Sequence, residues 1–269
     1  MEGLYFYCIR KRLYASSLFF TKGIDEKQEV FTLTHQELEA VVSKVSLEEF
    51  DSEAIKIKAQ NDLKWIKEKA VIHEKVIEEA MRNGEEILSL IPMKFGTIFK
   101  EEKVLKETLN KHYEQLKDTL KKLEGKQEWS IKVYLADKKN FEQVIKEKNE
   151  TIKEKEKEIA SLPEGMAFFM EEELREVIFK EVEKELNNII EGLFERLGKQ
   201  AVASVKGKIL GKELTGRPVP MVLNSAYLIS GKKIESFKEE AKSLNQEIQA
   251  KGFYLEYSGP WPAYNFSSF

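Results

Sequence analysis

Apolar residues near the N-terminus fall in short runs that favour strands, and further on they step by three and four. Residues 3–9, GLYFYCI, are aromatic and β-branched and too short for a helix, so they predict a buried first strand. Residues 30–33 and 39–45 are further strand candidates, although the second also suits a helix. From 52 to 82 apolar residues recur on one helical face, and Asn83-Gly84 predicts the end of that helix.

The segment from 86 to 125 predicts two strands and a helix. Residues 86–91 indicate a strand that Pro92 stops, and residues 93–99, MKFGTIF, indicate a strand interrupted by a glycine. A lone glycine in a strand more often marks a bulge or a packing site than a ligand loop, so we favour a structural role for it. Residues 101–123 predict a helix that ends at Gly125.

The C-terminal half has a clearer order of elements. The pattern predicts strands at 129–135, 201–210, 219–229 and 253–257, a turn at 215–218, and helices at 137–159, 165–197 and 230–251. Strand, helices, strand, strand, helix, strand is the ferredoxin-like order, a split βαβ arrangement.

The two consecutive helices at 137–159 and 165–197 conflict with that order. A parallel crossover needs one net helical traverse between its strands, and two antiparallel helices leave the wrong parity. Either the first helix breaks near Asn149, or it projects as a hairpin arm. Its stripe of Phe141, Ile145, Ile152 and Ile159 is thin, which favours a solvated helix with a narrow buried face over a coiled coil.

These elements predict an α+β protein of two domains, as the length of 269 residues also suggests. An N-terminal α/β domain covers residues 1–124, and a ferredoxin-like domain with long inserted helices covers 125–258. An extended tail, 259–269, follows.

The tail is unusually aromatic for a C-terminus. Its sequence is GPWPAYNFSSF, and we take as candidate site residues Pro260, Trp261, Pro262, Tyr264 and Phe266. The prolines restrict the unfolded chain and are incompatible with a central strand. We favour an interdomain clamp, because large aromatic side chains are more often buried than exposed. The alternative is an apolar patch that binds a partner protein.

Charge and cysteine content exclude several classes of protein. The 44 Lys and Arg residues nearly balance 47 Asp and Glu residues, which argues against a general nucleic-acid binder. The single cysteine, Cys8, cannot form an internal disulfide and is expected in the core. The N-terminus lacks the features of a signal peptide, and no apolar run is long enough to span a membrane. We therefore expect a soluble cytoplasmic protein.

No catalytic or cofactor motif stands out. His73-Glu74 begins an HExxH pattern, but position 77 is Ile, so we expect a solvated helical histidine and no zinc site. The phosphate-binding glycine motifs and nucleophile–base sets are also missing. We expect no catalytic residues, no metal and no cofactor.

Four blocks together resemble the gas vesicle protein F/L family. They are Leu4-Tyr5-Phe6-Tyr7, IPMKFGT at 91–97, LNSAYL at 223–228 and GPWP at 259–262. The match spans nearly the whole chain in the same order. The family tail usually has proline at the position of Ala263 and serine at that of Asn265, so the tail conformation need not be identical.

The resemblance implies a non-enzymatic accessory protein of gas vesicle formation. Such a protein would have two α/β domains and would bind the hydrophobic shell subunit and other accessory proteins. The alternative is a ferredoxin-like protein that binds RNA or a small ligand. The strand at 219–229 lacks the basic-Gly-aromatic run of RNA-binding strands, and the net charge is −3, so we disfavour RNA.

Overall fold

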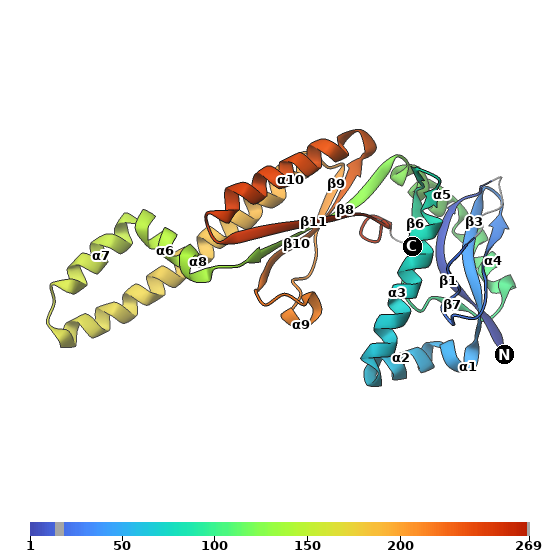
Figure 1. Ribbon diagram of the computed structural model, residues 1–269, viewed down its shortest axis with the longest axis horizontal. Coiled ribbons are helices and arrows are strands. Elements are labelled where there is room, and N and C mark those ends of the chain that lie inside the picture. The colour runs from blue at the N-terminus through green and yellow to red at the C-terminus, as the bar shows by residue number, and fades with distance from the viewer. Residues whose placement is uncertain (14–18, 268–269) are drawn as a thin grey trace. The chain divides into compact units, whose positions relative to one another are not determined.

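The computed structural model describes residues 1–13 and 19–267 and divides into two compact units (Figure 1). The first unit comprises Met1–Glu128 together with the segment that begins at Pro260, and the second comprises Trp129–Gly259. Helices and antiparallel sheets are mixed throughout the described residues, as the predicted α+β class requires.

The first unit is built on an antiparallel sheet with β1 (Glu2–Lys11) near its centre. The strand order is β2-β3-β1-β6, and β7 also pairs with β1. The partners are β2 (Val30–His35), β3 (Leu38–Ser46), β6 (Leu90–Pro92) and β7 (Ile98–Phe99). Eight consecutive residues of β1 are buried, which confirms the first predicted strand. Residues 39–45, which suited either element, lie in β3 because β1 and β2 pair with them on both sides.

Both long helices predicted in this unit are broken. Asp62 accepts a hydrogen bond from the backbone N–H of Trp65, so it caps a new helix inside the predicted 52–82 span. The 101–123 span breaks at His112. The helices are α1 (Leu47–Phe50), α2 (Ser52–Asn61), α3 (Leu63–Ala80), α4 (Glu102–Lys111) and α5 (Tyr113–Leu123), and β4 (Arg82–Asn83) pairs with β5 (Glu86–Ile87) in a small hairpin.

The prediction of one strand over residues 93–99 is wrong. The backbone N–H of Thr97 donates to the carbonyl of Lys94 at 3.1 Å, which closes a turn, and only Ile98–Phe99 pair as β7. Gly96 lies in the turn with φ of 81°, a conformation that glycine adopts without steric cost. The glycine therefore marks a turn and not a strand bulge.

The second unit holds a sheet with the order β11-β8-β10-β9. Its strands are β8 (Lys126–Leu135), β9 (Ala203–Lys206), β10 (Met221–Ser230) and β11 (Phe253–Trp261). Its helices are α6 (Lys138–Lys148), α7 (Glu150–Ala160), α8 (Glu164–Gly198), α9 (Lys212–Thr215) and α10 (Ile234–Gln249), with a 3₁₀ turn at Gly231–Lys233. The predicted strand at 201–210 shortens to β9, and the predicted turn at 215–218 begins within α9.

The helix predicted at 137–159 both breaks near Asn149 and forms part of a projecting arm, so the two alternatives occur together. The helix breaks at Asn149, whose extended backbone separates α6 from α7, and whose side chain accepts from the N–H of Ile152 to cap α7. Both helices lie beside the first part of α8 in a projecting arm (Figure 1). The later part of α8 contacts β10 and α10. The 35-residue α8 is thus long enough to return along the arm and also to supply the single traverse over the sheet.

The narrow apolar stripe on α6 and α7 is buried, as expected. Phe141, Ile145, Ile152 and Ile159 join the core of the second unit, while most of the Lys and Glu residues between them are exposed.

Gly252 joins α10 to β11 at a point where a side chain does not fit. Its φ is 86°, and a Cβ there would lie 2.5 Å from the carbonyl oxygen of Asp137. The carbonyl of Gly252 also accepts from the N–H groups of Ala136 and Asp137 at 2.8 and 3.0 Å. These two hydrogen bonds hold the end of β8 against the start of β11.

We expect Gly252→Ala to lower the free energy of unfolding by about 2 kcal/mol, since left-handed strain and a backbone clash act together. Gly216→Ala is the matched control, because φ is 66° there but no atom lies within 4 Å of the added Cβ. Its loss should be about 1 kcal/mol, from strain alone. Urea unfolding of both variants measures the difference. Equal losses would contradict the expected clash between the added Cβ and the Asp137 carbonyl.

Candidate functional site

The tail of candidate site residues leaves β11 and folds into a compact turn. The N–H of Tyr264 donates to the carbonyl of Pro262 at 2.7 Å. Pro262 is buried, whereas Trp261 and Tyr264 keep 37% and 39% of their surface exposed. Pro260 and Phe266 are half-buried. Ser268 and Phe269 lie outside the described residues. The turn therefore buries one proline and leaves two aromatic rings partly accessible.

Two glutamates of the first unit hold this turn. Asn265 donates twice to Glu128, from its backbone N–H to Oε2 at 3.0 Å and from Nδ2 to Oε1 at 2.6 Å. The hydroxyl of Tyr264 donates to Oε2 of Glu74 at 2.9 Å. Glu128 is only 4% exposed, so its carboxylate depends on these donors for hydrogen bonds. The structure thus brings Tyr264 and its neighbour Asn265 onto residues more than a hundred positions earlier.

Burial sets the electrostatics of the contact. It raises the pKa of both Glu74 and Glu128, while hydrogen bonds from the tail partly oppose the rise. The Glu74 charge raises the pKa of Glu128 further. Burial and the neighbouring Glu74 also raise the pKa of Tyr264, so its hydroxyl stays protonated and remains a donor. Neutral donors, rather than lysine or arginine, bind both oxygens of Glu128 and Oε2 of Glu74, whereas Oε1 of Glu74 is buried and has no hydrogen-bond partner among the described residues.

His73, which precedes Glu74 on α3, is buried and not solvated, so the sequence-based expectation is wrong. It is 3% exposed and lies among Tyr5, Tyr7 and Phe95, with ring centroids 5.6–5.8 Å away. The spacing of His73 with Val76, Ile77 and Ala80 places it on the buried stripe of the helix, and that signal could have indicated its position.

A continuous hydrogen-bond network surrounds His73. Its Nε2 lies 3.2 Å from the carbonyl oxygen of Met93, so Nε2 carries the proton, because a carbonyl only accepts. Nδ1 then accepts from the hydroxyl of Tyr5 at 3.1 Å, and the N–H of Gly96 donates to that hydroxyl at 2.9 Å. Residues 93–96 and the first strand thus meet around one neutral imidazole.

The burial of His73 predicts a pH-dependent stability. Burial lowers its pKa from 6.5 to about 4. As the pH falls, this histidine therefore takes up a proton at a higher pH in the unfolded chain than in the folded chain. The contribution of neutral His73 to the free energy of unfolding is complete above pH 6.5 and is lost as the pH falls toward 4. From this shift we expect a loss of about 2 kcal/mol between pH 7 and pH 5. Denaturant unfolding at a series of pH values measures it.

His73→Gln is the matched control, because the amide can still donate to Met93 and accept from Tyr5 without titrating. The raised pKa values of Glu74 and Glu128 act in the opposite sense, since their buried charges destabilise the fold above those values and protonation relieves this as the pH falls. They are present in both proteins, so the comparison isolates His73. Equal pH slopes in the two proteins would refute the assignment.

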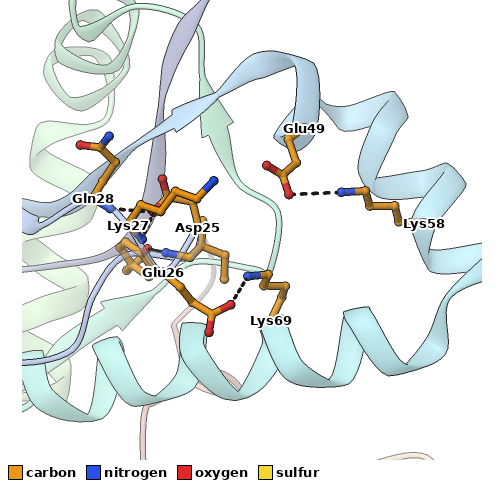
Figure 2. A network of polar contacts seen from close by, with 9 residues as sticks. Asp25, Glu26, Lys27, Gln28, Glu49, Lys58 and Lys69 are labelled. Atoms are coloured by element: carbon orange, nitrogen blue, oxygen red, sulfur yellow. Dashed lines mark hydrogen bonds and ion pairs between the residues drawn. The ribbon is translucent and has the colours of Figure 1, made fainter.

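A second polar cluster fastens the loop before β2 to α3 (Figure 2). The Asp25 carboxylate accepts from the backbone N–H groups of Lys27 and Gln28 at 3.0 and 2.9 Å. Lys69, largely buried on α3, donates to Glu26 at 2.6 Å. In the same view Lys58 lies 3.6 Å from Glu49. These contacts order a loop, and they place no nucleophile beside a base.

The remaining candidate chemistry is structural. Cys8 is fully buried, which confirms its expected place in the core and raises its pKa to about 12. Over residues 1–13 and 19–267, no three His, Cys, Asp or Glu side chains gather as metal ligands would. The same residues include no helix with the length and apolar character needed to cross a bilayer.

Comparisons with known proteins agree over almost the full chain. A family model described as "Gas vesicle synthesis protein GvpL/GvpF" matches residues 3–268. Gas vesicle protein F of Nostoc sp. (strain PCC 7120) is 26% identical over 67% of this chain and 70% of its own length. Gas vesicle protein L1 of Halobacterium salinarum is 24% identical over 99% of this chain and 90% of its own length.

Solved structures share the fold. The crystal structure of the gas vesicle protein GvpF from Anabaena sp. PCC7120 covers 100% of this chain and 99% of its own, with a TM-score of 0.77 at 21% identity. That of GvpF from Microcystis aeruginosa covers 99% of each chain with a TM-score of 0.69, also at 21% identity. The mixed helical and antiparallel architecture described above is therefore an established one.

Proposed function

This chain belongs to the gas vesicle synthesis protein family GvpL/GvpF, and from that premise we propose that it binds the hydrophobic shell subunit during gas vesicle assembly. Membership confirms the resemblance expected from the four sequence blocks and supports a role in gas vesicle formation. The observation that carries the proposal is that the match extends from residue 3 to residue 268, through both units and into the tail.

The proposed action is physical and non-enzymatic. A small, very hydrophobic subunit aggregates unless its apolar surface or strand edges are covered until assembly. An accessory protein can cover them by adding a strand or by offering an apolar helix face. The protein would work inside the cell where vesicles form, together with other accessory proteins and without a cofactor.

We also propose that the second unit is ferredoxin-like and that the arm is its insertion. The strand order β11-β8-β10-β9 supports this assignment, as does the antiparallel pairing of β9 with β10. We keep 1–124, 125–258 and 259–269 as the functional segments.

For the tail we propose the role of a clamp. The paired hydrogen bonds of Asn265 to Glu128 and the burial of Pro262 support it. The exposed portions of Trp261 and Tyr264 would then be the only parts of the described tail aromatics that reach a partner easily.

Co-expression tests the proposed function. The shell subunit is produced alone and with this chain, and its soluble fraction and its assembly into vesicles are measured. We expect both to rise when the chain is present. An equally soluble and equally assembled subunit without it would refute the proposal.

A further inference from the structure

Two glutamates of the first unit bind the C-terminal tail, and we call them the tail seat. Glu128 accepts from the backbone N–H and the side-chain amide of Asn265. Glu74 accepts from the hydroxyl of Tyr264. Both glutamates precede the second unit, Trp129–Gly259, whereas the tail follows it. The seat and its occupant are therefore joined in the chain only through the whole second unit.

The tail is uncharged in a strongly charged protein. Residues 257–267 contain no Lys, Arg, Asp or Glu, although these residues make up 34% of the chain. The groups that reach the seat are an amide, a backbone N–H and a hydroxyl. Because Glu128 is only 4% exposed, a cationic side chain would lose most of its hydration to reach it, and neutral donors avoid that cost. The chemistry of the seat thus fits an uncharged segment with a Tyr-Asn pair, which every copy of this chain carries.

The tail forms its own turn and leaves the second unit at a glycine. The N–H of Tyr264 donates to the carbonyl of Pro262 at 2.7 Å, and that of Phe266 donates to the carbonyl of Ala263 at 3.3 Å. These bonds lie within the tail, so they can form whichever copy supplies the seat. Gly259 has a φ of 151°, which residues with a side chain rarely adopt. Glycine also permits backbone rotations that would redirect the tail.

We propose that the tail seat also accepts the tail of a second copy, so that two chains can exchange tails. Exchange of an identical element conserves the contacts at the seat, which makes it a low-cost route to a dimer. The tail of the same chain has the advantage of its covalent attachment. The exchanged form is therefore expected at high protein concentration, or when a chain cannot seat its own tail.

The hydrogen bonding at the seat favours displacement of the tail. Oε1 of Glu74 is buried and has no hydrogen-bond partner among the described residues. An unpaired buried acceptor costs free energy, which limits how strongly the docked tail is held.

Two full-length variants with complementary defects test the exchange. Glu128→Leu, the seat variant, keeps the tail and removes two acceptors from the seat. Tyr264→Phe/Asn265→Ala, the tail variant, keeps the seat and removes both side-chain donors. Sedimentation velocity follows each variant alone and the two in equimolar mixture. We expect monomers alone and a heterodimer in the mixture, with association about tenfold tighter than for either variant by itself. A mixture that stays monomeric would overturn the proposal.

A third variant is the matched control. It combines both sets of substitutions, so a mixture with the seat variant has intact tails but no intact seat. We expect no heterodimer there, and one that persists would mean association through another surface and would refute the exchange. Raising the ionic strength should leave the expected heterodimer intact, because the donors are neutral. A heterodimer that salt dissolves would equally contradict the proposal. Circular dichroism and thermal melts establish that the variants are folded.

A peptide assay decides the question even if Glu128→Leu does not fold. A labelled peptide with the sequence of residues 259–269 is titrated with the full-length tail variant and with the original chain, and binding is followed by fluorescence anisotropy. We expect it to bind the tail variant more tightly than the original chain, whose own tail competes for the seat. The same peptide with Tyr264→Phe/Asn265→Ala should bind the tail variant about tenfold more weakly. Equal affinity of the two peptides would overturn the proposal.

Discussion

Replacing Arg10 with methionine is expected to lower the free energy of unfolding by about 3–5 kcal/mol, because it leaves the buried carboxylate of Glu39 without its partner. Both residues are almost completely buried, at 2% and 3% exposure. They lie directly opposite each other on β1 and β3, and Nε of Arg10 donates to Oε1 of Glu39 at 2.7 Å.

The surroundings of this pair explain the size of the effect. Nη1 of Arg10 also donates to the carbonyl of Ala80 at 2.6 Å, so the guanidinium joins the sheet to the end of α3. Methionine fills a similar length without donating a hydrogen bond. The variant would therefore lose the ion pair and leave the Ala80 carbonyl in need of a new donor.

The double variant Arg10→Met/Glu39→Leu is the control. Removing both charges together is expected to restore most of the lost stability, since apolar replacements of buried ion pairs are often neutral or better. Urea unfolding of the two single variants and the double variant gives the coupling energy. If the double variant is as unstable as Arg10→Met, the loss comes from packing and not from an unpaired charge.

A chain ending at Ser258 is expected to melt several degrees lower than the full chain. The truncation removes buried Pro262 and the three hydrogen bonds to Glu74 and Glu128. We estimate a loss on the order of 3 kcal/mol, with part of the gross contact energy offset by the ordering entropy of the tail. Differential scanning calorimetry measures it.

A point variant separates the anchors from the rest of the tail. Tyr264→Phe/Asn265→Ala keeps the chain length and the backbone bond to Glu128 but removes both side-chain donors. Its melting temperature should fall between those of the full and truncated chains. Pull-down of the shell subunit accompanies the melts. Lost binding at an unchanged melting temperature would show that the tail is a partner site and would refute the clamp.

The sequence by itself determined the class of most elements and the family. Period-two and period-3.6 patterns depend on local burial, so β1, β8, α8 and α10 were predicted close to their final bounds. The cap of α6 is equally local, since the Asp137 side chain accepts from the N–H of Asn140 three residues on. The four motif blocks indicated the family because they lie in order along the chain.

Only the tertiary structure decided the features that depend on contacts distant in sequence. The burial of His73 requires Tyr5, 68 residues earlier, and the anchoring of Asn265 requires Glu128, 137 residues away. A periodic pattern carries no information on which distant side chain will satisfy a polar group, because that depends on the packing of the whole unit. The exposure of Phe168, Phe169 and Phe179 on α8 is similar: the sequence shows these phenylalanines, but only the packing of the opposite side of the helix on the core leaves them exposed.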